Sequence, residues 1–435
     1  MTFKNGRLYS DDGRYFLHIQ NDGNTVSYAH DGRAIWNSGP DKHPELVPPL
    51  PTPPEPPIPP VVTLDPLHAT GRTLYAGDRP FQLRAITEFD LGHLARTGNT
   101  LEVARRMDRA KVYNRNVLRV LMMARTMFDL SPTMPGYWEA RARVELMAHE
   151  RGLRVEWTVF ADARLVMPNA IDRSRFLDAA WASFSRADLV GIGNELRCND
   201  NWTAAPTDPE ILSLADRVEP HDLVFSISDP DDVTTNTPYP GDPLKADLAT
   251  LAAHSPMLVL HGERKLRDAR WSGWCDHLKG FAEVAWDCNR VLYHQEPMGA
   301  ASTYIDGKRD NRPLAHLAAS LVCAVMQMGY CYHYISAADD TVPGLDLCAA
   351  AALVPVGPEW MPRNAGTGGA CVVSFSGYDK IRTCDNGTTA WAVGYGHRTG
   401  AVEWAAGWHP ITMGEWRQVV DGQEGAVTLW RAEKV

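Results

Sequence analysis

Eight short apolar runs recur along the middle of the chain at nearly even intervals. They begin near Phe81, Val117, Arg154, Leu189, Leu223, Met257, Arg290 and Gly329, so that neighbouring runs start 33 to 39 residues apart. Each run has the length of a buried strand, and each interval has room for one strand, one helix and two loops. The pattern predicts eight parallel βα units, and their even spacing favours a closed (β/α)8 barrel over an open doubly wound sheet.

Helical patterns separate these runs. Apolar residues at helical spacing form one stripe at Leu101, Ala104, Met107 and Ala110, and another at Tyr137, Ala140, Val144 and Met147. Before the first run, Thr73–Ala76 and Phe81–Ala85 flank the turn residues Gly77 and Asp78, which predicts a hairpin that closes the bottom of the barrel. No GxGxxG or GxxxxGK[ST] motif follows the first run, which argues against nucleotide binding.

A proline-rich segment divides the chain. Residues 44–60 hold ten prolines in seventeen positions, which predicts an extended polyproline II linker over 44–61. A ligand for a proline-reading domain is the alternative. Residues 1–43 contain three strand-like runs separated by turn residues, at Tyr15–Gln20, Thr25–Tyr28 and Ala34–Trp36. So small a β module buries little core alone, so we expect it to pack on its own symmetry mates or on a partner.

The barrel is predicted to span residues 62–353, and residues 354–435 have the pattern of a β-rich accessory domain. Strand-like runs there are Val372–Phe375, Thr389–Val393, Ala401–Trp404 and Ala426–Trp430. The tryptophans of this part, at positions 391, 404, 408, 416 and 430, fit a buried core better than a sugar platform.

Composition narrows the classes of function. The net charge of −10 offers no electrostatic footprint for nucleic acid. No run approaches 18 apolar residues, so no membrane span is expected, and the N-terminus lacks the apolar region of an ordinary signal peptide. The eight cysteines include no CxxC pair, which favours buried free thiols.

Acidic residues follow two of the predicted strands. Asn194 and Glu195 end the fourth, and Glu296 ends the seventh. The C-terminal ends of barrel strands meet at one mouth, where two facing carboxyl groups are what glycosidic bond cleavage needs.

This arrangement resembles clan A of the glycoside hydrolases, the cellulase-like superfamily of retaining enzymes. The resemblance implies that Glu195 is the acid/base and Glu296 the nucleophile. It also implies that Asn194 holds the sugar 2-hydroxyl and that Arg119, in the second strand, supports the nucleophile. The alternative is that acids at strand ends simply cap helices.

Further candidates lie at other strand ends. His261 ends the sixth strand, where the clan often places His or Tyr; Glu263 is a reserve nucleophile. His294 lies two residues before Glu296, so alternation predicts that they share a strand face. Tyr334, after the eighth strand, stands where the clan commonly has a tryptophan as sugar floor. Hydroxyl binding is also predicted for Asp162 and, after the first strand, for Glu88 and Asp90. No HExxH or calcium-loop motif is present, so neither a metal nor another cofactor is expected.

A second resemblance concerns the N-terminal module. Gln20, Asp22, Asn24, Val26 and Tyr28 match the QxDxNxVxY signature of the bulb-type, monocot mannose-binding lectins. In that family the four polar residues hydrogen-bond mannose and the valine packs against it. Those lectins fold as a three-fold β-prism built from three repeats. This chain shows one repeat, so three chains together would complete the prism. The alternative is a structural hairpin that binds no sugar.

Together these patterns predict a retaining glycoside hydrolase that acts on a polysaccharide or cell-surface glycan. The small N-terminal module, the linker and trimerisation fit a phage tail fibre or spike, hence a virion location and a virion partner; a cytoplasmic glycosidase is the other setting. The rival interpretation is a non-catalytic protein that binds a glycan receptor with a glycosidase-like barrel.

Overall fold

The computed structural model describes residues 2–4, 7–9, 15–19, 25–29, 34–37, 63–181, 183–194, 196, 208–227, 243–261, 286–296, 313–333, 344–364, 370–376, 378, 380–396, 401–420 and 423–435. They belong to two compact units, residues 1–52 and residues 53–435. The barrel predicted over 62–353 and the β-rich part predicted over 354–435 both fall in the second unit.

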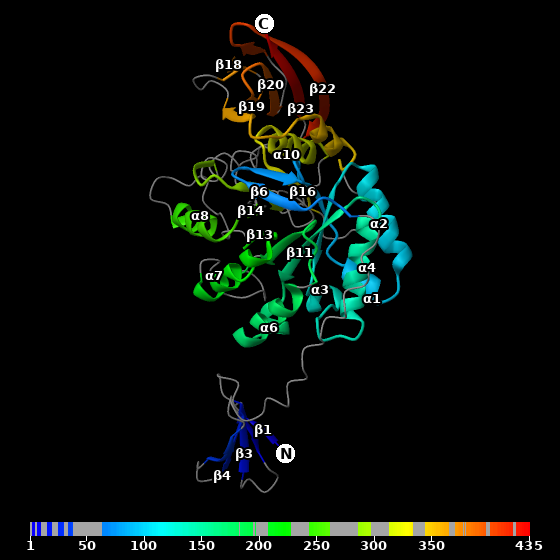
Figure 1. The fold of residues 1–435 in the computed structure, drawn as a ribbon, viewed down its shortest axis with the longest axis vertical. Helices are drawn as coiled ribbons and strands as arrows, with labels where there is room; N and C mark the ends of the chain where they lie inside the picture. The colour runs from blue at the N-terminus through cyan, green and yellow to red at the C-terminus, as the bar shows by residue number, and fades with distance from the viewer. Residues whose placement is uncertain are drawn as a thin grey trace. The chain divides into compact units, whose positions relative to one another are not determined.

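The N-terminal unit is a meander of five antiparallel strands paired in chain order (Figure 1). The strands are β1 (Thr2–Lys4), β2 (Arg7–Tyr9), β3 (Tyr15–Ile19), β4 (Thr25–Ala29) and β5 (Ala34–Asn37). Ile19 at the end of β3 pairs with Thr25 at the start of β4. Of the lectin-like signature, Val26 and Tyr28 fall on β4, whereas Gln20, Asp22 and Asn24 lie outside the described residues. Sugar binding by the five stays a prediction.

The second unit contains the predicted (β/α)8 barrel. Its strands are β9 (Arg84–Thr87), β10 (Val117–Leu121), β11 (Arg154–Phe160), β12 (Leu189–Gly193), β13 (Val224–Ser226), β14 (Met257–His261), β15 (Val291–Glu296) and β16 (Gly329–Tyr332). All neighbours pair in parallel, in the order β13-β12-β11-β10-β9-β16-β15-β14. The first barrel strand, β9, thus pairs with the last, β16, and β13 contacts β14.

Helices connect the strands. They are α1 (Leu91–Arg96), α2 (Thr100–Val112), α3 (Arg125–Phe128), α4 (Tyr137–His149), α5 (Ala163–Val166), α6 (Ala170–Trp181), α7 (Pro209–Asp216), the 3₁₀ helix η1 (Glu219–His221), α8 (Pro243–His254) and α10 (Pro313–Val325). The apolar stripe predicted for α2 was wrong in part: Leu101 is 85% exposed, and the buried face is Val103, Arg106, Met107 and Ala110.

A small antiparallel sheet closes the N-terminal end of the barrel. It consists of β6 (Leu67–Thr70), β7 (Thr73–Ala76) and β8 (Arg79–Pro80), with Gly77 at φ +55° in the turn between the last two. Leu67 and Leu74 belong to one apolar cluster with Val117 and Leu189, which lie at the first residues of their barrel strands. The predicted hairpin at the bottom is confirmed for its turn and its first arm, Thr73–Ala76, but its second arm was wrong, because Arg79–Pro80 pairs with β7 and Phe81–Ala85 leads into β9.

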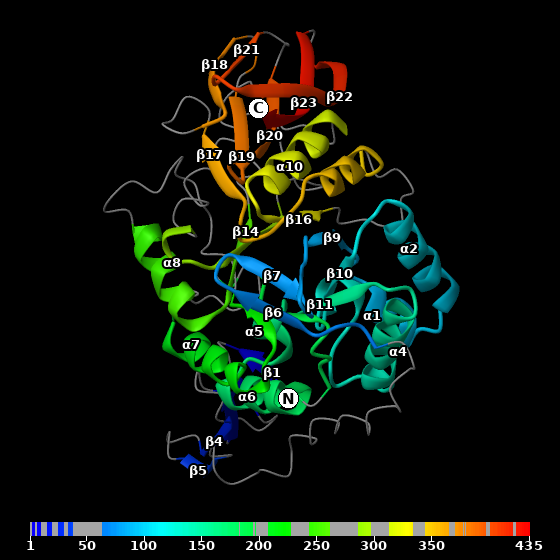
Figure 2. The same ribbon diagram turned by 45° about the horizontal axis from the view of Figure 1, so that its top comes forward.

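A β-rich part follows the barrel. The 3₁₀ helix η2 (Leu347–Leu353) leads into β17 (Met361–Asn364), β18 (Val372–Phe375), β19 (Lys380–Asp385), β20 (Thr389–Gly396), β21 (Val402–Trp404), β22 (Trp408–Val420) and β23 (Gln423–Lys434). Five strands form an antiparallel sheet in the order β17-β19-β20-β23-β22, and β18 pairs with β21. The sheet contacts α10, whose residues Leu314–Val325 are all buried (Figure 2). Trp391 and Trp430 are core residues, as predicted, whereas Trp404, Trp408 and Trp416 are only half-buried.

Candidate active site

Glu296 is the last residue of β15 and only 2% exposed. Its Oε1 accepts a hydrogen bond from Arg119 Nη1 at 2.5 Å. Arg119 lies in the middle of β10 and is fully buried. A buried carboxylate requires such a partner, because an unpaired charge in the barrel interior would lose its hydration without compensation. The predicted support of Glu296 by Arg119 is thus present as a direct contact.

The same guanidinium reaches the end of the fourth barrel strand. Arg119 Nη2 donates to Asn194 Oδ1 at 2.5 Å, and the Asn194 backbone N–H donates to the carbonyl of Phe160 at the end of β11. One arginine therefore joins the C-terminal ends of β12 and β15. Glu195 follows Asn194 directly but lies outside the described residues, so its distance from Glu296 stays a prediction.

Two imidazoles lie on the other side of the Glu296 carboxylate. Its Oε2 is 3.7 Å from His261 Nδ1 and 3.6 Å from His333 Nε2. His261 ends β14, as predicted. His333 follows β16, and its Nδ1 is 3.0 Å from Thr87 Oγ1. His333 was not among the predicted site residues. Tyr334, which was predicted to belong to the site, lies outside the described residues.

A second carboxylate lies deeper in the barrel. Glu156, on β11, is fully buried, and its Oε2 accepts from the Tyr293 hydroxyl at 2.9 Å. Its Oε1 accepts from Gln295 Nε2 and lies 3.9 Å from Arg119 Nε. Burial raises the pKa of Glu156, and Arg119, Tyr293 and Gln295 act in the opposite direction. Glu156 was not predicted to belong to the site. The sequence feature that could have indicated it is an acid in the middle of a buried strand, RVEWTVF.

An irregularity in β15 affects the prediction for His294. Leu260 pairs with His294 but His261 pairs with Glu296, so Gln295 is an extra residue in the register. Tyr293 and Gln295 both contact Glu156 in the interior. This bulge interrupts the strict alternation from which a shared face for His294 and Glu296 was predicted. His294 is buried, and its role in substrate binding stays a prediction.

Asp162 follows β11 and fixes a neighbouring loop. Its Oδ2 accepts from the backbone N–H of Thr126 at 3.0 Å and from Thr126 Oγ1 at 2.9 Å. Thr126 lies in α3, the short helix that follows β10 in the chain. Asp162 therefore shapes the rim of the barrel mouth through α3, and contact with a sugar hydroxyl stays a prediction.

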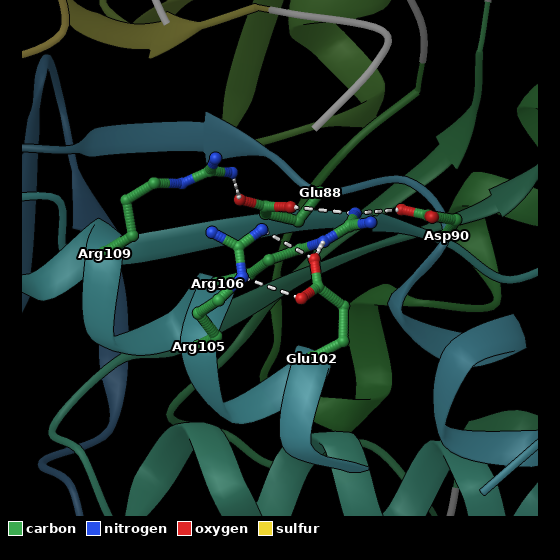
Figure 3. Close-up of polar contacts among 6 residues, drawn as sticks. All are labelled: Glu88, Asp90, Glu102, Arg105, Arg106 and Arg109. Carbon is green, nitrogen blue, oxygen red and sulfur yellow. Dashed lines mark hydrogen bonds and ion pairs between the residues drawn. The ribbon is translucent and has the colours of Figure 1, made fainter. Parts of the chain in front are cut away.

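Glu88 and Asp90, after β9, bind arginines of α2 (Figure 3). Glu88 Oε1 accepts from Arg109 Nη2 at 2.8 Å, and its Oε2 lies 3.4 Å from Arg106 Nη1, which is 2.6 Å from Asp90 Oδ1. Burial raises the pKa of Glu88, and the two arginines act against it. Glu88 is fully buried and tied to a helix, so this corrects the expectation that its carboxylate binds substrate hydroxyls.

Other features of the described residues bear on the class of site. No group of three or more His, Cys, Asp or Glu side chains among them is arranged to hold a metal ion. No helix in the described ranges is long and apolar enough to cross a membrane. Free, buried thiols are confirmed for Cys323, Cys331, Cys348, Cys371 and Cys384, whereas Cys288 is half-buried.

Comparison with known proteins identifies the architecture. No protein-family model and no curated protein matches the chain. A solved structure described as a glycoside hydrolase aligns with a TM-score of 0.58 and 13% identity over 85% of this chain and 97% of that chain. A glycoside hydrolase family 5 from Bacteroides vulgatus gives a TM-score of 0.56 and 12% identity over 85% and 92% of the two chains. The chain shares the fold of these glycoside hydrolases.

Proposed function

We propose that this chain is a retaining glycoside hydrolase with Glu296 as nucleophile and Glu195 as acid/base. The supporting observation is the double contact of Arg119. It binds Glu296 on one side and Asn194 on the other, and Asn194 immediately precedes Glu195. A buried arginine at 2.5 Å favours the ionised form of Glu296, which is the form a nucleophile requires.

The proposed reaction has two steps. In the first, Glu296 attacks the anomeric carbon while Glu195 gives its proton to the departing glycosidic oxygen, which breaks the bond and leaves a glycosyl ester on Glu296. In the second, Glu195 takes a proton from water, and the water oxygen displaces Glu296 from the anomeric carbon. This double displacement retains configuration and suits carboxyl groups about 5–5.5 Å apart. It uses no metal or other cofactor.

Substrate contacts are assigned by position at the barrel mouth. Asn194 is proposed to bind the sugar 2-hydroxyl, and His261 to line the subsite next to Glu296. His294, Asp162 and Tyr334 complete the proposed substrate-binding set. Arg119 orients Glu296 and is shielded from solvent.

The proposed substrate is a polysaccharide or cell-surface glycan, and the proposed setting is a phage tail fibre or spike in the virion. The lectin-like signature over residues 20–28 and the proline-rich segment 44–60 support this organisation. A homotrimer, or a virion partner held by the N-terminal module, belongs to the same proposal.

Activity of matched variants on a panel of bacterial and plant polysaccharides tests the enzymatic role. Glu296→Gln and Glu195→Gln are expected to lose several orders of magnitude in kcat, because each removes a group that reacts. Glu403→Gln, on β21, is the control and should equal wild type. Glu296→Ala should regain turnover with azide and yield a glycosyl azide of inverted configuration. Equal activity of wild type and Glu296→Gln would exclude Glu296 from the mechanism, and glycan binding without turnover in wild type would favour the receptor-binding alternative.

A further inference from the structure

A chain of three buried polar side chains leads from the barrel interior to the Glu296 carboxylate. Glu156 on β11 accepts a hydrogen bond from Gln295 Nε2, and Gln295 Oε1 lies 2.8 Å from His261 Nε2. His261 Nδ1 faces Glu296 Oε2 at 3.7 Å. Glu156, Gln295 and His261 are each buried, so solvent does not compete for these contacts.

Glu156 determines which way the Gln295 amide points. A carboxylate oxygen accepts hydrogen bonds, so the amide nitrogen of Gln295 is directed at Glu156 and the amide oxygen at His261. This orientation is also compatible with a protonated Glu156, because a proton on Oε2 can be accepted by the Tyr293 hydroxyl, 2.9 Å away, while Oε1 still accepts from Gln295.

The Gln295 amide in turn determines the tautomer of His261. An amide oxygen only accepts, so the imidazole nitrogen facing it, Nε2, carries hydrogen. In the neutral ring the other nitrogen, Nδ1, then presents a lone pair toward Glu296 Oε2. Nδ1 carries a hydrogen only when the ring is an imidazolium.

We propose that Glu156, acting through Gln295, holds His261 in the Nε2–H tautomer, so that neutral His261 offers no hydrogen to the attacking oxygen of Glu296. The inference rests on the proposed role of Glu296 as nucleophile. Oε1 accepts a hydrogen bond from Arg119, and the attack is assigned to Oε2, which faces His261 and His333. A hydrogen bond to Oε2 stabilises the charge that the attack consumes and therefore slows it. Glu156 and Gln295 are positioning residues, because they act through His261.

An imidazolium at His261 would carry hydrogen on both ring nitrogens. The charged and titratable groups that face His261 and its carboxylate neighbours are Glu296 on β15, Glu156 on β11, Arg119 on β10 and His333 after β16. Once imidazolium forms, Nδ1–H points at Oε2 and the attack slows. Loss of the Glu156–Gln295 contact would allow a neutral Nδ1–H tautomer, which has the same effect without protonation.

The tautomer can be measured without turnover. In protein labelled with ¹⁵N-histidine, one- and two-bond ¹H–¹⁵N correlations distinguish Nε2–H from Nδ1–H, and His261→Gln assigns the signal. Wild type is expected in the Nε2–H form near pH 8. Gln295→Met should shift His261 toward Nδ1–H or a mixture, while Gln82→Met, a glutamine at the opposite end of the barrel, should leave it unchanged. An Nδ1–H signal in wild type, or an unchanged signal in folded Gln295→Met, would overturn the proposal.

Kinetics supply a second readout. Gln295→Met is expected to lower kcat about tenfold at neutral pH, the scale of one hydrogen bond, with little change in KM. Glu156→Met, which leaves no acceptor for Gln295 Nε2, is the second variant if Gln295→Met fails to fold, and it should show the same change in tautomer. Full activity of Glu296→Gln would reject the nucleophile while leaving the tautomer result intact, so the two failures are distinguishable.

Discussion

The ring of Phe89 lies over the guanidinium of Arg119, whose Cζ is 5.0 Å from the ring centroid. The same ring is 5.7 Å from the ring of His333. Phe89 stands between Glu88 and Asp90, and both of these acids bind Arg106 of α2. Contacts on both sides thus fix the segment that carries the ring, and the ring restricts the position of the arginine that holds Glu296.

Phe89→Leu tests this packing. Leucine keeps most of the apolar volume but removes the aromatic face, which contributes about 0.5–2 kcal/mol to a desolvated cation. We expect kcat to fall about tenfold and Tm to fall by a few degrees. Phe81→Leu is the matched control, because Phe81 lies under Arg154, 5.1 Å from its Cζ, at the other end of the barrel. Equal kcat in the two variants would contradict a role for Phe89 beyond stability.

Two adjacent arginines of α2 should differ sharply in their effect on stability. The side chain of Arg106 is 3% exposed and binds Glu88, Asp90 and Glu102, whereas that of Arg105 is 42% exposed and binds Glu102 (Figure 3). Arg106→Met should lower the free energy of unfolding by about 3 kcal/mol, because it takes one of two arginines from the fully buried Glu88 and the arginine from Asp90. Arg105→Met should cost less than about 1 kcal/mol. Urea unfolding of both variants measures the difference, and similar midpoints would refute it.

Arg119→Lys should inactivate the proposed enzyme while preserving the charge. The guanidinium binds Glu296 and Asn194 with two different nitrogens, and a lysine ammonium cannot reproduce that fork. We expect kcat to fall on the order of a hundredfold, two to three kcal/mol of lost stabilisation. Arg154→Lys, which changes a buried arginine at the N-terminal end of β11, should retain activity. Activity of Arg119→Lys near that of wild type would show that charge alone is sufficient.

Stability should depend on pH through α4. Burial raises the pKa of Glu145 to about 7, although Arg141 opposes the shift. A pKa that is higher in the folded than in the unfolded protein gives stability that is present at low pH and is lost as pH rises. The free energy of unfolding of wild type relative to Glu145→Gln should therefore fall between pH of about 4.5 and about 7, by on the order of 1–3 kcal/mol. Glu139→Gln, an exposed change on the same helix, is the control. A flat difference across this range would refute the shift.

His149 should act in the same direction. Burial by itself would lower the pKa of His149, but the hydrogen bond and charge of Asp188 outweigh it and raise the pKa. Its stabilising contribution is complete below the unfolded pKa of about 6.5 and is lost as pH rises through the higher folded value. NMR titration of His149 should show a pKa above that of a free histidine, and Asp188→Asn should lower it.

The barrel was predictable because its signal is repetitive. The strand starts predicted from apolar runs lie within three residues of the observed ones, the largest difference being at Phe81, where β9 begins at Arg84. Buried parallel strands need continuous apolar sequence, so each run stands out from the polar helix surfaces. Several antiparallel strands, including β17, β19 and β22, were missed, since their sequences mix polar and apolar residues, as KIRTCD does in β19, and form no such run.

The contacts of the site were less predictable. Glu296 was found because it ends an apolar run, and Arg119 because the resemblance to clan A implies an arginine in the second strand. Glu156 and Gln295 were missed, because their role depends on which interior side chains meet across strands far apart in sequence. The bulge at Gln295 changes the facing of residues in β15, and no sequence signal marked it. Leu101 was placed on the apolar face of α2 because helical spacing alone does not reveal that Arg106, held by its acidic partners, lies on the buried face instead.

Helix α10 has a consequence for how the chain could be divided. Its residues are apolar around the whole circumference and buried, and both β16 and the C-terminal sheet contact it. A truncation that ended after the eighth barrel strand would expose one side of this helix to water as a continuous apolar patch, which favours aggregation. The barrel and the C-terminal sheet therefore belong to a single folding unit, and recombinant fragments or chimaeras should keep residues 313–435 together with the rest of the barrel.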